Sequence, residues 1–139
     1  MDKQKVIQKL NEAFNYELMG AIRYLHYSFM VFGVRRIPVV EHLREEAEES
    51  FGHATKLGEK IAALGGTPSV SISESLKGKI KTVEQILKES LEHEMNAVKM
   101  YSDLLKDVQD DVVLDAFVRE FVSEEQSHAE EVEKMLREP

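Results

Sequence analysis

The sequence predicts an all-α protein built as a four-helix bundle, and three observations support this fold class. Only three prolines and seven glycines interrupt its 139 residues. The long intervals between them place apolar residues at steps of three and four, the period of a helix with one buried face. Each interval is about 27 residues, or about 40 Å of helix at 1.5 Å per residue, and four such helices bury their apolar stripes against one another.

The first two helices have recognisable ends. The first is expected over residues 3–32, with Asp2 as its N-cap and Gly33 as its stop. The second is expected over residues 38–64, because Pro38 suits a first helical turn and a pair of glycines follows the last apolar residue. The short connection makes these two helices antiparallel neighbours.

The last two helices form a second hairpin. The third is expected over residues 83–108, after a capping box made by Thr82 and Gln85. The fourth is expected over residues 111–137, after a pair of aspartates. Its connection to the third helix is again only a few residues long.

The segment 65–81 joins the two hairpins and is polar, rich in Ser, Gly and Lys. Its residues can extend to about 55 Å, which is enough to run the length of a 40 Å bundle. We therefore expect a crossover that makes the second and third helices parallel, within one domain over residues 1–139. A mobile linker is the alternative, but neither hairpin alone has enough helices to bury its stripes.

Composition excludes several classes of function. The chain has no cysteine, so disulfides, thiolate metal sites and cysteine nucleophiles are excluded. With 26 acidic and 18 basic side chains the net charge is −8, which argues against nucleic acid as a partner. The apolar run 29–34 is far shorter than the roughly 20 residues that span a membrane, and the charged N-terminus is unlike a signal peptide. We expect a soluble, cytoplasmic protein with no membrane partner.

Polar residues interrupt the apolar stripe near the midpoint of every helix. A carboxylate or imidazole in a bundle core must be paired or bound to a ligand, although a single one often reaches water instead. The midpoints of bundled helices share one level, so we expect these side chains to converge: Glu17, His53, Glu94, Glu125 and His128. Mixed carboxylate and imidazole ligands favour iron or manganese, with zinc as a competitor.

An internal repeat supports this hypothesis. Aligning the two hairpins pairs Glu17 with Glu94, and a tyrosine follows each seven positions later, Tyr24 and Tyr101. A His-Ala pair then follows in each half, His53-Ala54 and His128-Ala129. Shared helical periodicity explains the apolar matches, but it explains the Glu, Tyr and His matches less well.

These helices resemble the ferritin-like family, and bacterioferritins in particular. The resemblance covers all four helices, which read LNEAFNYELMGAIRY, EHLREEAEESFGHATKLGEKIAALGGTPS, SLEHEMNAVKMY and REFVSEEQSHAEEVEKML. That family places a Glu on the first and third helices and a Glu-x-x-His on the second and fourth, which together bind two iron ions. The resemblance therefore implies that Glu17, His53, Glu94, Glu125 and His128 are metal ligands.

The sequence departs from the family pattern in three places. The second helix carries Ser50-x-x-His53, so one carboxylate is missing, and Phe51 stands where haem-binding members have a methionine ligand. We therefore expect no haem. The chain also ends at Pro139 without the fifth helix of 24-subunit cages, so a homo-oligomer such as a dimer or dodecamer is expected instead.

The resemblance implies a protein that binds two ferrous ions and lets oxygen or peroxide oxidise them, in iron storage or detoxification. Bridging carboxylates hold such ions about 3.5 to 4 Å apart. Glu94 and Glu125 are the expected bridging or chelating groups and Glu17 a terminal ligand. Tyr24 is a candidate to hydrogen-bond a ligand carboxylate or donate an electron, and a packed aromatic role is its alternative.

The missing carboxylate leaves two divalent ions with three negative charges, so one further anion is expected near His53. Glu49 is the nearest candidate, at i−4 from His53. Glu46 shares the stripe, but its side chain leans toward the N-terminus and away from the site. Hydroxide or another solvent-derived anion is the alternative.

Two other functions compete with the ferrous-oxidising one. A non-catalytic bundle with a degenerate metal site is favoured by Ser50, but disfavoured by the other buried ligands, which destabilise a core without metal. A DNA-protecting miniferritin needs a basic tail or a site between subunits. Metal analysis of the purified protein separates the ferrous-oxidising function from the non-catalytic bundle.

Overall fold

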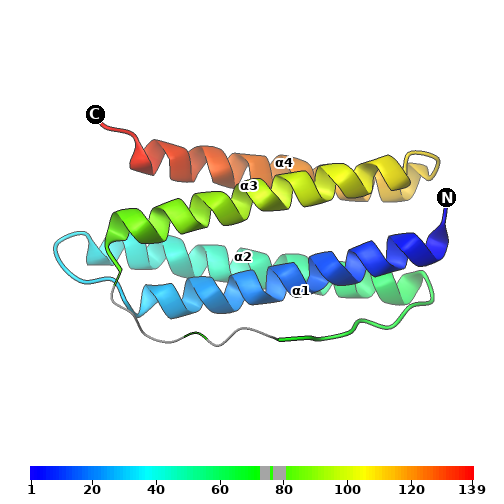
Figure 1. The fold of residues 1–139 in the computed structure, drawn as a ribbon, viewed down its shortest axis with the longest axis horizontal. Helices are drawn as coiled ribbons and strands as arrows, with labels where there is room; N and C mark the ends of the chain where they lie inside the picture. The colour runs from blue at the N-terminus through cyan, green and yellow to red at the C-terminus, as the bar shows by residue number, and fades with distance from the viewer. Residues whose placement is uncertain (73–75, 77–80) are drawn as a thin grey trace. The chain divides into compact units, whose positions relative to one another are not determined.

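The computed structural model describes residues 1–72, 76 and 81–139. These residues contain four α-helices and no strand: α1 (Lys3–Ser28), α2 (Arg36–Ala63), α3 (Val83–Asp107) and α4 (Val112–Leu136) (Figure 1). They group into two compact units, one of Met1–Lys9 with Leu87–Pro139 and one of Leu10–Ile86. Over the described ranges, no helix has the length and apolar character that a bilayer crossing requires.

Helix α1 ends at Ser28, four residues before the predicted end at residue 32. The prediction was wrong because helical hydrogen bonding gives way to a turn after Ser28, where the Phe29 and Met30 backbone N–H groups donate to carbonyls only three residues back. The Ser28 hydroxyl donates to the Leu25 carbonyl at 2.6 Å, and the Arg36 guanidinium donates to the Val31 carbonyl at 2.6 Å. The chain therefore leaves the helix in a tight turn.

The other helix ends lie within two residues of their predicted positions. Helix α2 begins at Arg36, two residues early, so Pro38 lies in the first turn, where its missing N–H is not needed. At α3, the Thr82 and Gln85 side chains each accept from the other's backbone N–H, as expected for a capping box. Asp111 caps α4 by accepting from the Leu114 backbone N–H at 3.0 Å.

In the unit Leu10–Ile86, α1 and α2 pack as an antiparallel hairpin (Figure 1). Their contacts run in opposite directions along the two helices. Arg44 Nε donates to Ser28 Oγ at 3.2 Å near the loop, and a Cβ added at Gly58 would lie 3.5 Å from the Phe14 ring further along. The apolar core of this unit includes Leu10, Ala13, Ala21, Tyr24, Leu43, Ala54, Leu57 and Ile61.

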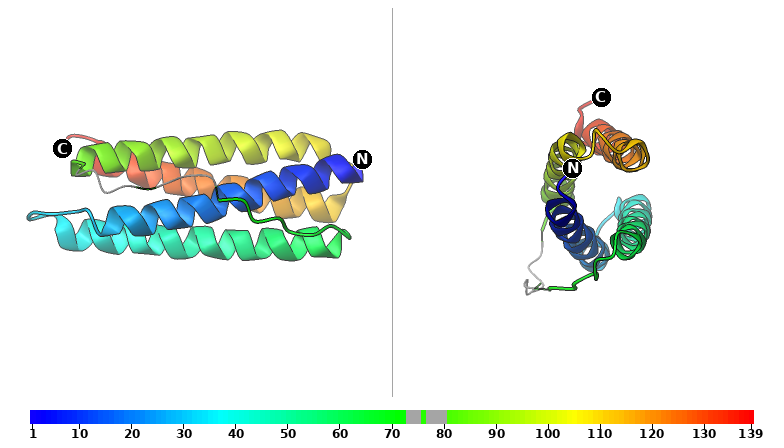
Figure 2. Two further views of the ribbon diagram at one scale, coloured as in Figure 1. Left: turned by 60° about the horizontal axis from the view of Figure 1, so that its bottom comes forward. Right: turned by 90° about the vertical axis from the view of Figure 1, so that its right-hand side faces the viewer.

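The segment that follows α2 runs beside α1 (Figure 2), and two asparagines of α1 bind its backbone. Asn11 accepts from the Ser69 backbone N–H at 2.8 Å, and Asn15 accepts from the Ser71 backbone N–H at 2.7 Å. The Asn15 amide also donates to the Ser69 carbonyl at 2.7 Å. These bonds satisfy an extended backbone that has no strand partner.

The same segment reaches the other end of α1. The Lys81 ammonium lies 5.2 Å from the centroid of the Tyr27 ring, and Arg35 pairs with Glu84 at 2.6 Å. The start of α3 therefore lies beside the α1–α2 loop, which confirms the predicted crossover. Residues 73–75 and 77–80 of the predicted crossover lie outside the described residues.

In the other unit, α3 and α4 form a second antiparallel hairpin (Figure 1). Tyr101 stacks on Phe121 with ring centroids 5.0 Å apart and planes inclined by 26°. The first residues of α1 are attached to the end of α3 by Lys9, which pairs with Asp103 and Asp107. This unit therefore combines α3, α4 and the first turns of α1.

Candidate metal centre

The unit Leu10–Ile86 holds two of the predicted ligands in contact. Glu17 on α1 is 1% exposed and His53 on α2 is 5% exposed. His53 Nδ1 lies 3.4 Å from Glu17 Oε1. The antiparallel register of the hairpin brings them together, because both residues are near the middle of their helices. We call this pair the α1–α2 cluster.

The other unit holds the remaining three predicted ligands in contact. His128 Nδ1 lies 3.7 Å from Glu94 Oε2 and 3.8 Å from Glu125 Oε2. Each of the three residues offers one ligand atom, and these atoms all lie within 4.8 Å of one another. Glu125 and His128 share a helix face at i and i+3, and Glu94 faces them from α3. We call these residues the α3–α4 cluster.

The donor sets fit a hard to borderline divalent cation. Glu94 and Glu125 are 1% and 3% exposed, so both carboxylates are almost fully removed from water. Two neighbouring buried carboxylates repel each other and lose hydration, which a bound cation offsets. The α3–α4 cluster offers two negative charges and one neutral nitrogen, and the α1–α2 cluster offers one negative charge and one nitrogen. This chemistry suits ferrous iron, manganese or zinc.

Glu49, predicted to supply the missing charge, lies on α2 with an exposed side chain. Its neighbour Glu46 is 7% exposed and offers a carboxylate oxygen within 4.8 Å of one from Glu49. Glu46 is therefore a further candidate ligand, which the sequence argument set aside because of the direction in which its side chain leans. Its place on the apolar stripe of α2 was the signal that favoured burial.

Tyr24 is 2% exposed on α1, on the same face as Glu17 and two turns further along. Its counterpart Tyr101 on α3 is completely buried and stacks on Phe121. Both tyrosines of the internal repeat are therefore core residues. Their burial is compatible with both roles considered for Tyr24.

Two buried serines near the clusters were not predicted as site residues. Ser90 is 1% exposed, and its hydroxyl has no hydrogen-bond partner among the described residues. It lies one turn before Glu94 on α3. Ser50, the residue that breaks the second Glu-x-x-His motif, is 5% exposed and lies one turn before His53 on α2. Polar residues on an apolar stripe, one turn before a predicted ligand, are the signal that identifies both.

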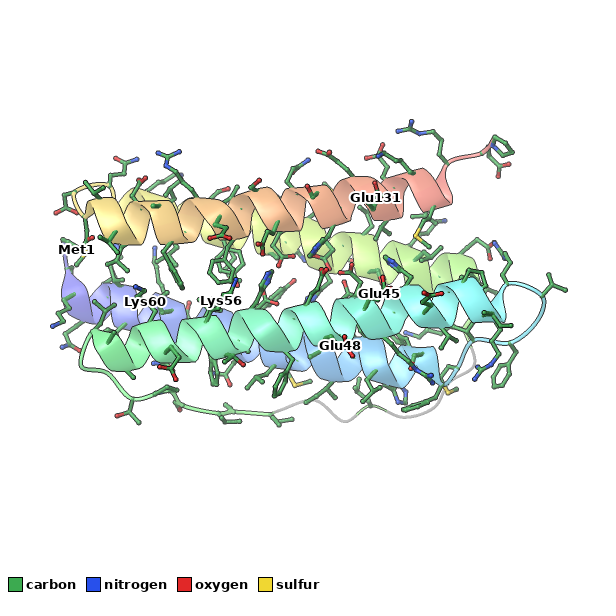
Figure 3. The ribbon with its side chains drawn as sticks, turned by 180° about the vertical axis from the view of Figure 1, so that it is seen from behind. Met1, Glu45, Glu48, Lys56, Lys60 and Glu131 are labelled. Carbon is green, nitrogen blue, oxygen red and sulfur yellow. The ribbon has the colours of Figure 1, made fainter. Side chains whose placement is uncertain are left out.

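The charged residues outside the clusters are mostly exposed. Figure 3 labels four of them along α2, Glu45, Glu48, Lys56 and Lys60, of which only Lys60 is part-buried. Surface charges of this kind stay hydrated and need no ligand. The buried carboxylates of the two clusters, like that of Glu46, therefore differ from the exposed acidic residues.

Comparison with known proteins identifies the family. A family model described as the ferritin-like domain matches residues 7–139. The chain belongs to the ferritin-like family. A bacterial ferritin from Neisseria meningitidis serogroup B is 31% identical over 137 residues, covering 96% of this chain and 88% of the relative. A bacterioferritin from Brucella melitensis biotype 1 is 30% identical over 136 residues, with 95% and 83% covered.

Solved structures of the ferritin-like family share this fold. The crystal structure titled ferritin-like, diiron-carboxylate proteins from Bacillus anthracis str. Ames has a TM-score of 0.89 at 27% identity and covers 99% of both chains. A dodecameric thioferritin from Bacteroides fragilis also has a TM-score of 0.89, at 20% identity, with 98% of this chain and 86% of that chain covered. The predicted fold class and the predicted family resemblance are both confirmed.

Proposed function

We propose that this ferritin-like protein binds ferrous iron as its substrate, one ion in each cluster, and promotes its oxidation by oxygen or peroxide. The observation that carries the proposal is the α3–α4 cluster, where two buried carboxylates and an imidazole offer ligand atoms within 4.8 Å of one another. The family match over residues 7–139 supports iron as the metal. A pair of ferrous ions supplies the redox chemistry when bound, one electron from each ion.

The residues of the chain prepare that chemistry in three ways. Glu94 and Glu125 neutralise a divalent ion, and His128 adds a nitrogen ligand from the same helix as Glu125. Glu17 and His53 bind the second ion with a smaller total charge. Four of the five side chains are buried and His128 is 18% exposed, so charge on the bound iron is balanced mainly by fixed carboxylates and less by solvent.

Tyr24 is proposed to assist, either as a hydrogen-bond donor to a ligand carboxylate or as a source of an electron. Its burial on the same face as Glu17 supports this role. Glu49 is proposed as the protein's own source of the missing negative charge near His53. A homo-oligomer is expected, as for the dodecameric thioferritin that shares this fold.

Metal analysis and anaerobic titration test the proposal. We expect two ferrous ions per chain, followed by iron oxidation when oxygen or peroxide is admitted. Glu125→Gln should remove one ion and slow oxidation, while Glu124→Gln, a neighbouring glutamate that belongs to neither cluster, should leave both unchanged. Absence of bound metal and of ferrous oxidation would instead support a non-catalytic bundle with a degenerate metal site.

A further inference from the structure

Ser90 on α3 carries a hydroxyl group that is buried and forms no hydrogen bond among the described residues. Its side chain is 1% exposed, and its oxygen has no hydrogen-bond partner over those residues. A buried hydroxyl of this kind is rare in folded proteins, because it has lost its bonds to water and gained none in exchange. The Ser90 hydroxyl is therefore a donor available to a neighbouring group.

Other hydroxyl groups on the helices use the local backbone. Ser28 Oγ donates to the Leu25 carbonyl at 2.6 Å. Thr55 Oγ1 donates to the Phe51 carbonyl at 3.0 Å. A carbonyl group three or four positions back is a usual acceptor for a hydroxyl inside a helix. Ser90 makes no such bond to the described turn before it, which leaves its hydroxyl for a partner on the same helix face.

The facing residue of α4 offers Ser90 no side-chain acceptor. The contact of Glu94 with His128 sets the antiparallel register of the α3–α4 hairpin, and the aromatic stack further along the two helices agrees with it. One turn before Glu94, this register places Ser90 opposite Val132, which is completely buried and apolar. An alkyl side chain neither donates nor accepts a hydrogen bond. The polar neighbours of Ser90 are therefore to be found on α3 itself.

His93 and Glu94 follow Ser90 by three and four positions, so both lie beside it on the helix surface. Side chains on a helix lean toward its N-terminus, so the Glu94 side chain leans over the turn that carries Ser90. A neutral imidazole has one acceptor nitrogen, whereas a carboxylate that binds a cation through one oxygen keeps lone pairs on the other. Hydrogen bonds to a charged acceptor are also stronger. Glu94 is therefore the acceptor that suits Ser90 better.

We propose that Ser90 is a positioning residue for Glu94, whose carboxylate oxygen that does not bind the ion accepts a hydrogen bond from the Ser90 hydroxyl. This inference rests on the proposed function, because the bond forms when Glu94 binds the ion. Glu94 is 1% exposed, so a donor from the protein replaces water at that oxygen. The bond fixes the direction in which the other oxygen faces the ion, as donors to ligating groups do in metal sites generally.

Anaerobic titration with cobalt(II) tests the proposal without reference to activity. Ser90→Ala removes the donor and little else, so we expect binding at one of the two sites to weaken by about tenfold or more. Thermal unfolding without metal should give a Tm equal to or above that of the parent protein, because the lost hydroxyl had no partner there. A purely structural role for the hydroxyl would lower this Tm.

Two further variants serve as controls. Ser102→Ala makes the same change on the same helix, two turns beyond Glu94, and should leave the cobalt affinity unchanged. Ser90→Thr keeps the hydroxyl and should restore most of the affinity that Ser90→Ala loses. Circular dichroism confirms that each variant is folded.

Infrared difference spectra of zinc-loaded against zinc-free protein give a readout that does not depend on affinity. They isolate the carboxylates that change when the ion binds. A hydrogen bond to the oxygen that does not bind the ion lowers the antisymmetric stretching frequency of the carboxylate. Ser90→Ala should therefore move one carboxylate band to higher frequency. Ser90→Thr should keep the band of the parent protein, even if its additional methyl group lowers the stability of the fold.

Three outcomes overturn the inference. If Ser90→Ala binds cobalt as tightly as the parent protein, or moves no carboxylate band, Ser90 does not position Glu94 and the proposed function still stands. If Ser90→Ala lowers the Tm of the metal-free protein, the hydroxyl has a structural partner instead. If the parent protein binds no cobalt, the proposed function fails, and the role of Ser90 fails with it.

Discussion

Replacing Glu94 by glutamine separates a metal ligand from a structural ion pair. Glu94 is 1% exposed, and its Oε2 lies 3.7 Å from His128 Nδ1. Glutamine keeps the size of the side chain and removes its charge. If Glu94 is a metal ligand, the variant is more stable than the parent protein without metal and binds metal more weakly. If Glu94 only pairs with His128, the variant lowers the stability of the metal-free protein.

The expected magnitudes follow from burial and distance. In the metal-free protein, removing one of two buried carboxylates relieves repulsion and desolvation, which we expect to stabilise the fold by about 1 kcal/mol. For a chain of this length that raises Tm by about 3 °C. Two unit charges 4 Å apart interact by about 4 kcal/mol at an effective dielectric constant of 20. Water can bind the metal in place of the lost carboxylate and recover part of this interaction energy. We therefore expect metal binding to weaken by about 2 to 4 kcal/mol.

Two measurements check this prediction. Thermal unfolding of the metal-free protein shows whether stability rises or falls. Anaerobic ferrous or cobalt titration measures the change in metal affinity, for which we expect about 30- to 1000-fold weaker binding. Glu92→Gln, an exposed glutamate two residues away on α3, is the control and should change neither quantity. A lower Tm without metal, together with unchanged affinity, would refute the role of Glu94 as a ligand.

Three further predictions concern the stability of the fold, its dependence on pH and the binding of haem. Asn15→Ala should lower the unfolding free energy by about 1 to 2 kcal/mol, measured by urea titration, since two bonds to the backbone after α2 are lost. Lys9 lowers the pKa of Asp107 from 3.8, so the stabilisation lost in Asp107→Asn should be full near neutral pH and vanish as pH falls through the depressed pKa. Unfolding midpoints of both proteins from pH 2 to 7 check that sign, and a constant difference contradicts it. The purified protein should show no Soret band after haem supplementation, because Phe51 has no lone pair to bind haem iron.

The sequence predicted the helices well because their signals are local. Caps such as Asp111 and the box of Thr82 and Gln85 act within one turn, so their residues are adjacent in the sequence. The end of α1 was missed because the chain turns at Phe29 and Met30, before it reaches Gly33, and the loop that follows is held by Arg36, which donates from α2 to the Val31 carbonyl. That contact exists only once the α1–α2 loop has formed, so no pattern within α1 indicates it.

The candidate site was predicted in part, for a comparable reason. Glu17, Glu94 and Glu125 interrupt apolar stripes, and a charged residue in such a position has few explanations other than a buried partner or ligand. Glu46 was judged by the direction in which its side chain leans and not by its position on the stripe. Ser50 and Ser90 were harder to identify, because a serine on a stripe is common and its hydrogen bonding depends on tertiary contacts.

The unequal charges of the two clusters bear on how metal binding and folding are coupled. A buried carboxylate destabilises the metal-free protein, and the α3–α4 cluster has two of them where the α1–α2 cluster has one. The α1–α2 unit also contains the crossover, which Asn11 and Asn15 attach to α1 without any metal. Among the predicted ligands, the two carboxylates that lie together within one unit are those of the α3–α4 cluster, so we expect the stability of that unit to depend most on the bound ion. We therefore expect the serine at position 50, in place of a glutamate, to favour the fold of the α1–α2 unit at the expense of its affinity for metal.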